Sequence, residues 1–209
     1  LPGAGQRIGL LGGSFNPAHA GHRAISLAAL RRLRLDAVWW LVAPQNPLKT
    51  TAGTAPLRTR LAAARAAAAH PRIVVTPLEA VLGTTYTADT IAALAGRFPR
   101  VRFVWLMGAD NLIQVSRWRR WPAIFATVAV AVFDRPTYAL RALAAPAARR
   151  FAPWRLPESR AGCLAGRAPP VWVFIRQRQN AESSTRIRAA AGKRKAKQAP
   201  GGRSRRSTK

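Results

Sequence analysis

Residues 12–22 read Gly-Gly-Ser-Phe-Asn-Pro-Ala-His-Ala-Gly-His and separate two regular patterns. The apolar run at 8–11 is typical of a buried strand, and Ile25, Ala29 and Leu33 then recur on one face of a helix. The stretch is therefore predicted to be a strand-to-helix turn. Turns of this kind are where open α/β sheets bind phosphate groups.

The predicted turn has the chemistry of an anion site. Gly12 and Gly13 carry no Cβ, so a ligand can come close to the backbone. A helix that begins near Gly21 aims unpaired N–H groups at the same place. His19 and His22 add imidazoles, which donate hydrogen bonds when neutral and carry charge when protonated. A His-x-x-His spacing alone is also typical of a polar surface pair, so the spacing by itself assigns no function.

The full stretch resembles the signature of the nucleotidyltransferase superfamily, Gly-x-Phe-x-Pro-x-His-x-Gly-His. A second stretch, residues 183–188 (Ser-Ser-Thr-Arg-Ile-Arg), resembles the Ser-Ser-Thr-x-Ile-Arg box of the same superfamily. Hydroxyls, helix N-terminal amides and Arg188 together predict a second polyphosphate site. Glu182 replaces the usual apolar residue before that box, and Asn16 replaces a frequent Asp in the first motif.

Two middle segments resemble the nicotinate mononucleotide adenylyltransferases of that superfamily. Residues 84–90 match the segment Ser/Thr-Tyr-Thr-x-x-Thr, whose backbone meets the pyridine carboxylate in that family, and Trp118 matches the aromatic residue that stacks on the pyridine ring. The residues also allow a plainer interpretation, in which Thr87 and Asp110 cap two helices. Trp121, next to Pro122, is predicted to be a packing residue.

A proline-containing segment follows the strand predicted at 37–42. Pro44 and Pro47 cannot continue strand pairing, so Asn46 and Lys49 are expected on a loop at the carboxyl edge of the sheet. In adenylyltransferases resembling this chain, the corresponding Pro-x-x-Pro-x-Lys loop lies beside the substrates. Lys49 is also compatible with an ordinary exposed lysine.

The resemblance covers residues 8–191 and implies that ATP and nicotinate mononucleotide give deamido-NAD and pyrophosphate, a step of NAD biosynthesis. The catalytic residues that it implies are His19, His22, Lys49 and Arg188. The implied ATP-binding residues are Gly12, Gly13, Ser14, Phe15, His19, His22, Gly108, Asp110, Ser183, Ser184, Thr185 and Arg188. The implied nicotinate-nucleotide-binding residues are Asn46, Lys49, Thr85, Tyr86, Thr87 and Trp118.

No protein-held metal is expected. The chain has only seven acidic residues, which are scattered, so Mg²⁺ is expected to be carried by the oxygens of ATP and by water. Three histidines and the single Cys163 make no conventional zinc set and exclude an internal disulfide.

Composition predicts one catalytic domain with a basic tail. At 209 residues and 49% hydrophobic content, residues 1–192 can form one core. Residues 193–209 hold eight of the 35 basic residues and are expected to be disordered. No apolar run reaches the roughly 18 residues of a membrane span, and a cytoplasmic soluble protein is expected.

The net charge of +28 also fits a nucleic-acid-binding protein. Outside the tail, however, the basic residues are mostly arginines among alanines, as on solvated helix faces, so nucleic-acid binding is expected only as a non-specific property of the tail. Two alternatives stay open. One is a sister adenylyltransferase acting on nicotinamide mononucleotide or a pantetheine phosphate, and the other is a basic nucleic-acid-binding module.

The fold class follows from the order of the patterns. Six apolar runs of strand length alternate with helical segments, which predicts an α/β fold with a doubly wound, mostly parallel, Rossmann-like sheet and a site at its carboxyl edge. The predicted strands are 8–11, 37–42, 73–76, 101–107, 127–133 and 171–175, and the predicted helices include 56–69, 87–97 and 138–150. Residues 151–170 are predicted to be irregular.

Overall fold

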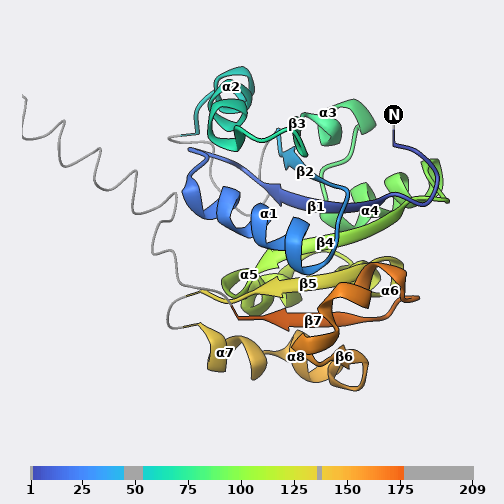
Figure 1. Ribbon diagram of the computed structural model, residues 1–209. Coiled ribbons are helices and arrows are strands. Elements are labelled where there is room, and N and C mark those ends of the chain that lie inside the picture. Colours follow the sequence, from blue (N-terminus) through green and yellow to red (C-terminus); the bar gives the residue numbers. More distant parts are fainter. Residues whose placement is uncertain (1, 45–53, 136–137, 177–209) are drawn as a thin grey trace, which may run out of the picture.

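The computed structural model describes residues 2–44, 54–135 and 138–176 (Figure 1). In these ranges seven strands form one sheet in the order β3-β2-β1-β4-β5-β7-β6, and every neighbouring pair is parallel. The strands are β1 (Arg7–Gly13), β2 (Ala37–Val42), β3 (Ile73–Thr76), β4 (Arg102–Gly108), β5 (Ala129–Phe133), β6 (Arg155–Leu156) and β7 (Trp172–Ile175).

The strand order reverses between β1 and β4. From β1 the chain builds outward through β2 to β3, and it then returns to place β4 on the other side of β1. In open parallel sheets, ligands bind at this switch point, outside the carboxyl ends of the two strands. The turns after Gly13 and Gly108 lie there.

Helices cover both faces of the sheet, with α1 on the near face and α4 and α5 behind it in Figure 1. The helices are α1 (Ala20–Arg32), α2 (Leu57–Ala68), α3 (Leu78–Leu82), α4 (Thr87–Arg97), α5 (Ala109–Gln114), α6 (Trp121–Thr127), α7 (Ala139–Leu143) and α8 (Pro146–Arg150). Three 3-10 segments are η1 (Val115–Arg117), η2 (Ala152–Trp154) and η3 (Glu158–Gly166). None of the helices described is long and apolar enough to cross a membrane.

Two apolar cores lie on the two faces. One joins α1, α2 and η3 to the sheet and includes Leu33 and Trp40, and the other joins α4, α5, α6 and α8 to it and includes Trp105 and Phe125. Burial on both faces explains why the strands read as continuous apolar runs.

The predicted fold class is confirmed, and the differences are local. The helix predicted at 138–150 is two short helices, because Pro146 begins α8 and cannot continue α7. The segment predicted to be irregular holds β6, a two-residue edge strand that pairs with β7, and η3. Such a short strand leaves no periodic pattern to detect.

Two predicted helix caps are wrong. Helix α4 begins after Tyr86 and α5 begins after Gly108, and neither has a side-chain cap. Thr87 is the first residue inside α4, and Asp110 lies inside α5, so neither occupies the capping position.

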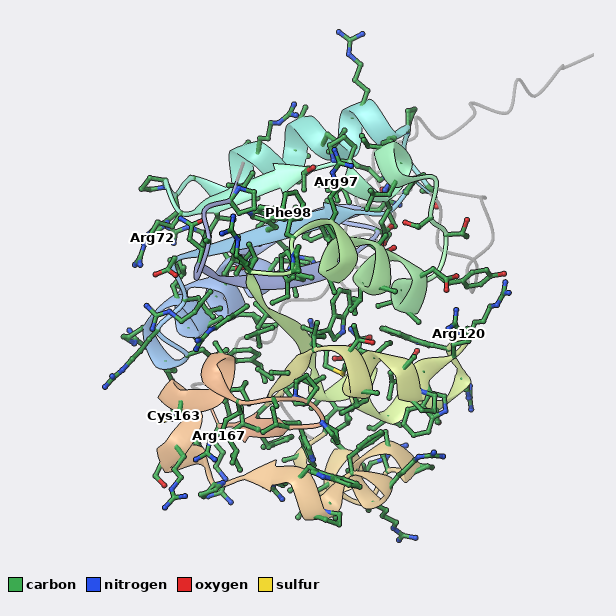
Figure 2. The ribbon with its side chains drawn as sticks, turned by 90° about the vertical axis from the view of Figure 1, so that its right-hand side faces the viewer. Arg72, Arg97, Phe98, Arg120, Cys163 and Arg167 are labelled. Atoms are coloured by element: carbon green, nitrogen blue, oxygen red, sulfur yellow. The ribbon has the colours of Figure 1, made fainter. Side chains whose placement is uncertain are left out.

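Arginines are dispersed over the surface. Figure 2 shows Arg72, Arg97, Arg120 and Arg167 well apart on one side of the molecule, at the ends of different elements. This distribution agrees with the prediction of solvated basic faces.

Candidate active site

The turn after β1 is held by an aromatic stack. Phe15 has a left-handed backbone with φ of 45° and is 1% exposed. Its ring stacks on Trp40 at 5.0 Å and contacts His22 at 4.6 Å, measured between ring centroids. The Phe15 side chain therefore supports the turn from inside. Any contact of Phe15 with a ligand would come from its backbone.

The backbone of His22 is held by a hydrogen bond from Ser26 of the same helix, which is itself bonded to Trp40 of β2. Trp40 donates from Nε1 to Ser26 Oγ at 2.7 Å, and that hydroxyl donates to the His22 carbonyl at 2.9 Å. Trp40 and Ser26 are both fully buried. The first turn of α1 is thus fixed to β2.

His19 and His22 form a reciprocal cap at the start of α1. His19 Nδ1 accepts a hydrogen bond from the Gly21 amide at 3.1 Å, and His22 Nδ1 accepts one from the His19 amide at 3.3 Å. The ring centroids are 4.0 Å apart. Because Nδ1 accepts in each ring, each ring carries its proton on Nε2. Both histidines therefore satisfy helix amides while keeping a ring N–H donor.

His22 is neutral at physiological pH. Burial lowers its pKa from 6.5 to about 3, and electrostatic interactions with the neighbouring His19 and with the positively charged Arg135 act in the same direction. The sequence predicted a donor that could also carry charge. In this structure His22 is neutral and carries its proton on Nε2.

Gly12 and Gly13 are glycines for different reasons. A Cβ on Gly12 would lie 2.5 Å from the Trp105 ring, so packing below the turn requires glycine there. A Cβ on Gly13 would make only an ordinary contact, 3.5 Å from the Phe15 ring. Core packing therefore requires a glycine at position 12 but not at position 13.

A second turn lies beside the first, at the end of β4. Gly108 is followed by Asp110, whose carboxylate pairs with Arg135 at 3.3 Å. A Cβ on Gly108 would collide with both Asp110 and Arg135, so this glycine leaves room for the ion pair. Asp110 matches the ribose-contacting position of the resemblance, and its carboxylate is already oriented by an arginine.

Arg135 is a candidate site residue that the sequence analysis did not identify. It follows β5 at the carboxyl edge of the sheet, and its charge acts on both Asp110 and His22. The rule that ligands bind beyond the ends of parallel strands could have identified it, because Asp134 and Arg135 directly follow a buried strand.

Two contacts made by arginines connect the start of α4, where the predicted residues Thr85, Tyr86 and Thr87 lie, to the segment next to Trp118. The Arg119 guanidinium lies over the Tyr86 ring at 4.7 Å, and Arg120 pairs with Asp89 at 3.0 Å. These contacts join the start of α4 to the turn that carries Trp118, which packs partly buried against the second core. Thr85 is exposed. Helix α4 runs from the carboxyl edge of the sheet back toward the start of β4.

Threonines brace this start of α4. Thr90 is fully buried, and its Oγ1 donates to the Tyr86 carbonyl at 3.2 Å and lies 2.8 Å from Thr84 Oγ1. Trp121 packs edge-on against Phe125 and Phe151, as predicted for a packing residue.

Several predicted site residues lie outside the described residues. They are Asn46, Lys49, Ser183, Ser184, Thr185 and Arg188. Their assignments stay predictions, as does the boundary between residues 1–192 and 193–209.

Comparisons with known proteins agree with this geometry. Residues 10–190 match the cytidylyltransferase-like family. A Bradyrhizobium protein named probable nicotinate-nucleotide adenylyltransferase is 59% identical over 89% of this chain and 97% of its own length. A Methylorubrum extorquens protein of the same name is 55% identical over 87% and 98%.

The fold also matches a solved structure of the Plasmodium falciparum nicotinic acid mononucleotide adenylyltransferase complexed with NaAD. That match has a TM-score of 0.66 at 15% identity and covers 88% of this chain and 83% of the other. At this identity the match shows the fold alone. The curated relatives carry the closer assignment, and the chain therefore belongs to the nicotinate-nucleotide adenylyltransferase family.

Proposed function

We propose that this chain transfers the adenylyl group of ATP to nicotinate mononucleotide, releasing pyrophosphate and forming deamido-NAD. The observation that carries this function is the 59% identity to a curated relative over 97% of that relative's length. The two glycine turns side by side at the switch between β1 and β4 supply a matching site.

The reaction needs positioning more than acid-base chemistry. A phosphate oxygen of nicotinate mononucleotide, already anionic, forms a bond to the α-phosphorus of ATP as the bond from that phosphorus to the bridging oxygen breaks. Pyrophosphate leaves with the electron pair. A neutral His22 donates from Nε2 to a phosphate oxygen without needing to gain or lose a proton.

We assign the adenosine ribose to the turn after β4. The Asp110 carboxylate can accept hydrogen bonds from two sugar hydroxyls, and it forms an ion pair with Arg135. Arg135 also supplies positive charge close to His22, where the phosphates would lie.

We assign the acceptor's pyridine ring to the start of α4 and Trp118. Backbone amides at a helix N-terminus favour an anion, so residues 85–87 would favour the nicotinate carboxylate over the neutral amide of nicotinamide. Trp118 would stack on either ring.

We further propose that Mg²⁺ enters bound to ATP and that the reaction takes place in the cytoplasm. Within the described ranges no group of three His, Cys, Asp or Glu side chains could hold a metal ion, and Asp110 is paired with Arg135. Mg²⁺ commonly keeps waters and substrate phosphate oxygens as ligands. The single cysteine fits a reducing compartment.

Acceptor choice tests this function. With saturating Mg-ATP, kcat/KM for nicotinate mononucleotide should exceed that for nicotinamide mononucleotide by at least about a hundredfold, roughly 2.7 kcal/mol. Pyrophosphate release is measured with both acceptors and with a pantetheine phosphate. A preference for either of the other two acceptors would overturn the substrate assignment.

A variant pair tests the role of the helix start. Thr87→Pro removes one backbone N–H at the first position of α4, where proline is tolerated, and the extended Tyr86 backbone suits a following proline. It should lower kcat/KM for nicotinate mononucleotide about tenfold and change the nicotinamide value less. Thr87→Ala keeps the N–H and is the control. Equal losses for both acceptors would remove that N–H from acceptor choice.

A further inference from the structure

Arg60 is a buried arginine in an otherwise exposed basic face of α2. It is 3% exposed, whereas Arg58 and Arg65 of the same helix are exposed. Its guanidinium donates to four backbone carbonyls, from Nε to Ala55 at 2.8 Å, from Nη1 to Ser14 and Ala43 at 2.7 Å each, and from Nη2 to Pro44 at 2.7 Å.

These carbonyls belong to three separate pieces of chain. Ser14 is in the turn after β1, Ala43 and Pro44 follow β2, and Ala55 precedes α2. Two more hydrogen bonds join the same pieces. The Ala43 amide donates to the Gly13 carbonyl at 3.0 Å, and the Ala55 amide donates to Asn16 Oδ1 at 3.4 Å.

The bond to Ser14 also fixes a donor in the turn. The Ser14 carbonyl and the Phe15 N–H belong to one planar peptide and point in opposite directions. Holding the carbonyl on Arg60 therefore directs the Phe15 N–H to the other side of the peptide. Phe15 has a positive φ, a conformation that persists only where surrounding contacts hold it.

Only a guanidinium suits this arrangement. Four of its five N–H groups are used, in a planar fork that reaches four oxygens. A lysine ammonium has three N–H groups on one atom and cannot reproduce that spread. Burial lowers the pKa of Arg60 from its ordinary value, yet an arginine stays protonated in proteins, so it also places a positive charge behind the turn.

We propose that Arg60 is a positioning residue for the adenylyl transfer. It holds the phosphate-binding turn after β1 in a fixed position relative to the chain on either side of residues 45–53. This inference rests on the proposed function, because its kinetic test uses that reaction. Arg60 is buried and bonds to backbone carbonyls, so in this proposal it acts on the substrates through the turn.

The test compares Arg60→Lys with Arg58→Lys, the same substitution at an exposed arginine two residues earlier in α2. Arg60→Lys should keep the far-UV circular dichroism of the wild type and lower kcat by at least about tenfold. Arg58→Lys should leave kcat and both KM values within about twofold of wild type. Millimolar guanidinium added to Arg60→Ala should restore part of the lost kcat and should not change Arg58→Ala. Wild-type kinetics in Arg60→Lys would overturn the proposal.

Hydrogen exchange separates positioning from general loss of stability and does not depend on the acceptor. In Arg60→Lys, peptides covering residues 12–17 and 54–56 should exchange faster, while peptides from β4 and β5 should exchange as in wild type. Uniformly faster exchange would overturn the proposal. If the wild type failed to use nicotinate mononucleotide but the exchange change stayed local, the proposed acceptor would fail and the role of Arg60 would stand.

Discussion

At the scale of single residues, the site is built from side chains whose protonation depends on distant partners. His22 is neutral because it is surrounded by Phe15 and Trp40 and faces the charge of Arg135. The motif predicted the histidine and its helix start, since both are local in the sequence. It could not predict how far the pKa of His22 is lowered, because the largest cause is burial, which depends on side chains such as Trp40 of β2.

His22→Ala should lower kcat by about a hundredfold or more, the scale expected when a preorganised donor is lost. His70→Ala is the matched control, since the His70 ring accepts a hydrogen bond from the Arg72 amide beside it, near the start of β3. Steady-state pyrophosphate release with both variants measures the difference. Near-normal kcat in His22→Ala would remove this histidine from the mechanism.

At the scale of elements, the inner strands were predictable, whereas the two-residue edge strand β6 and the short helices were not. The inner strands β1, β2, β4, β5 and β7 are apolar runs largely buried on both faces, so composition alone marks them. The caps were mispredicted at Thr87 and Asp110 because polar residues near a helix start resemble caps whether or not they bond. Here Asp110 is drawn instead to Arg135 of a later strand end.

The turn after β1 gives a test that separates packing from binding. Gly12→Ala should lower the free energy of unfolding by about 1 to 3 kcal/mol, because the new methyl meets the Trp105 ring. Gly13→Ala should leave that free energy within about 1 kcal/mol of wild type and raise the KM for ATP, because the methyl narrows the approach to the turn. Urea unfolding and ATP titrations measure the two effects. If Gly12→Ala and Gly13→Ala lowered the free energy of unfolding equally, the assignment of Gly12 to packing and of Gly13 to binding would be contradicted.

At the scale of the whole molecule, the pKa values of two buried groups are shifted in opposite directions. Burial raises the pKa of Glu79 from 4.5 to about 7, whereas the pKa of His22 is lowered from 6.5 to about 3. Below pH 6.5 the unfolded chain gains a proton on His22 that the folded chain does not, so stability falls with falling pH. Above pH 4.5 the unfolded chain loses a proton from Glu79 that the folded chain keeps, so stability falls with rising pH.

Between pH 4.5 and 6.5 these two slopes should cancel in the wild type. In Glu79→Gln only the His22 slope remains, so the free energy of unfolding should rise with pH, by at most about 1.4 kcal/mol per pH unit. Urea unfolding followed by tryptophan fluorescence across this window measures both slopes. Parallel curves for wild type and Glu79→Gln would show that Glu79 is not protonated in the folded chain.

The bonds from Arg60 to four carbonyls bear on how the length of the segment between Pro44 and Ala55 can vary. Pro44 and Ala55 are fixed to the same guanidinium, so the gap between them is set by the folded scaffold and not by the number of residues that bridge it. Closing a longer segment between Pro44 and Ala55 costs little conformational free energy, only about 0.6 kcal/mol for each doubling of its length. Insertions between these two anchors are therefore expected to leave the geometry of the turn after β1 unchanged.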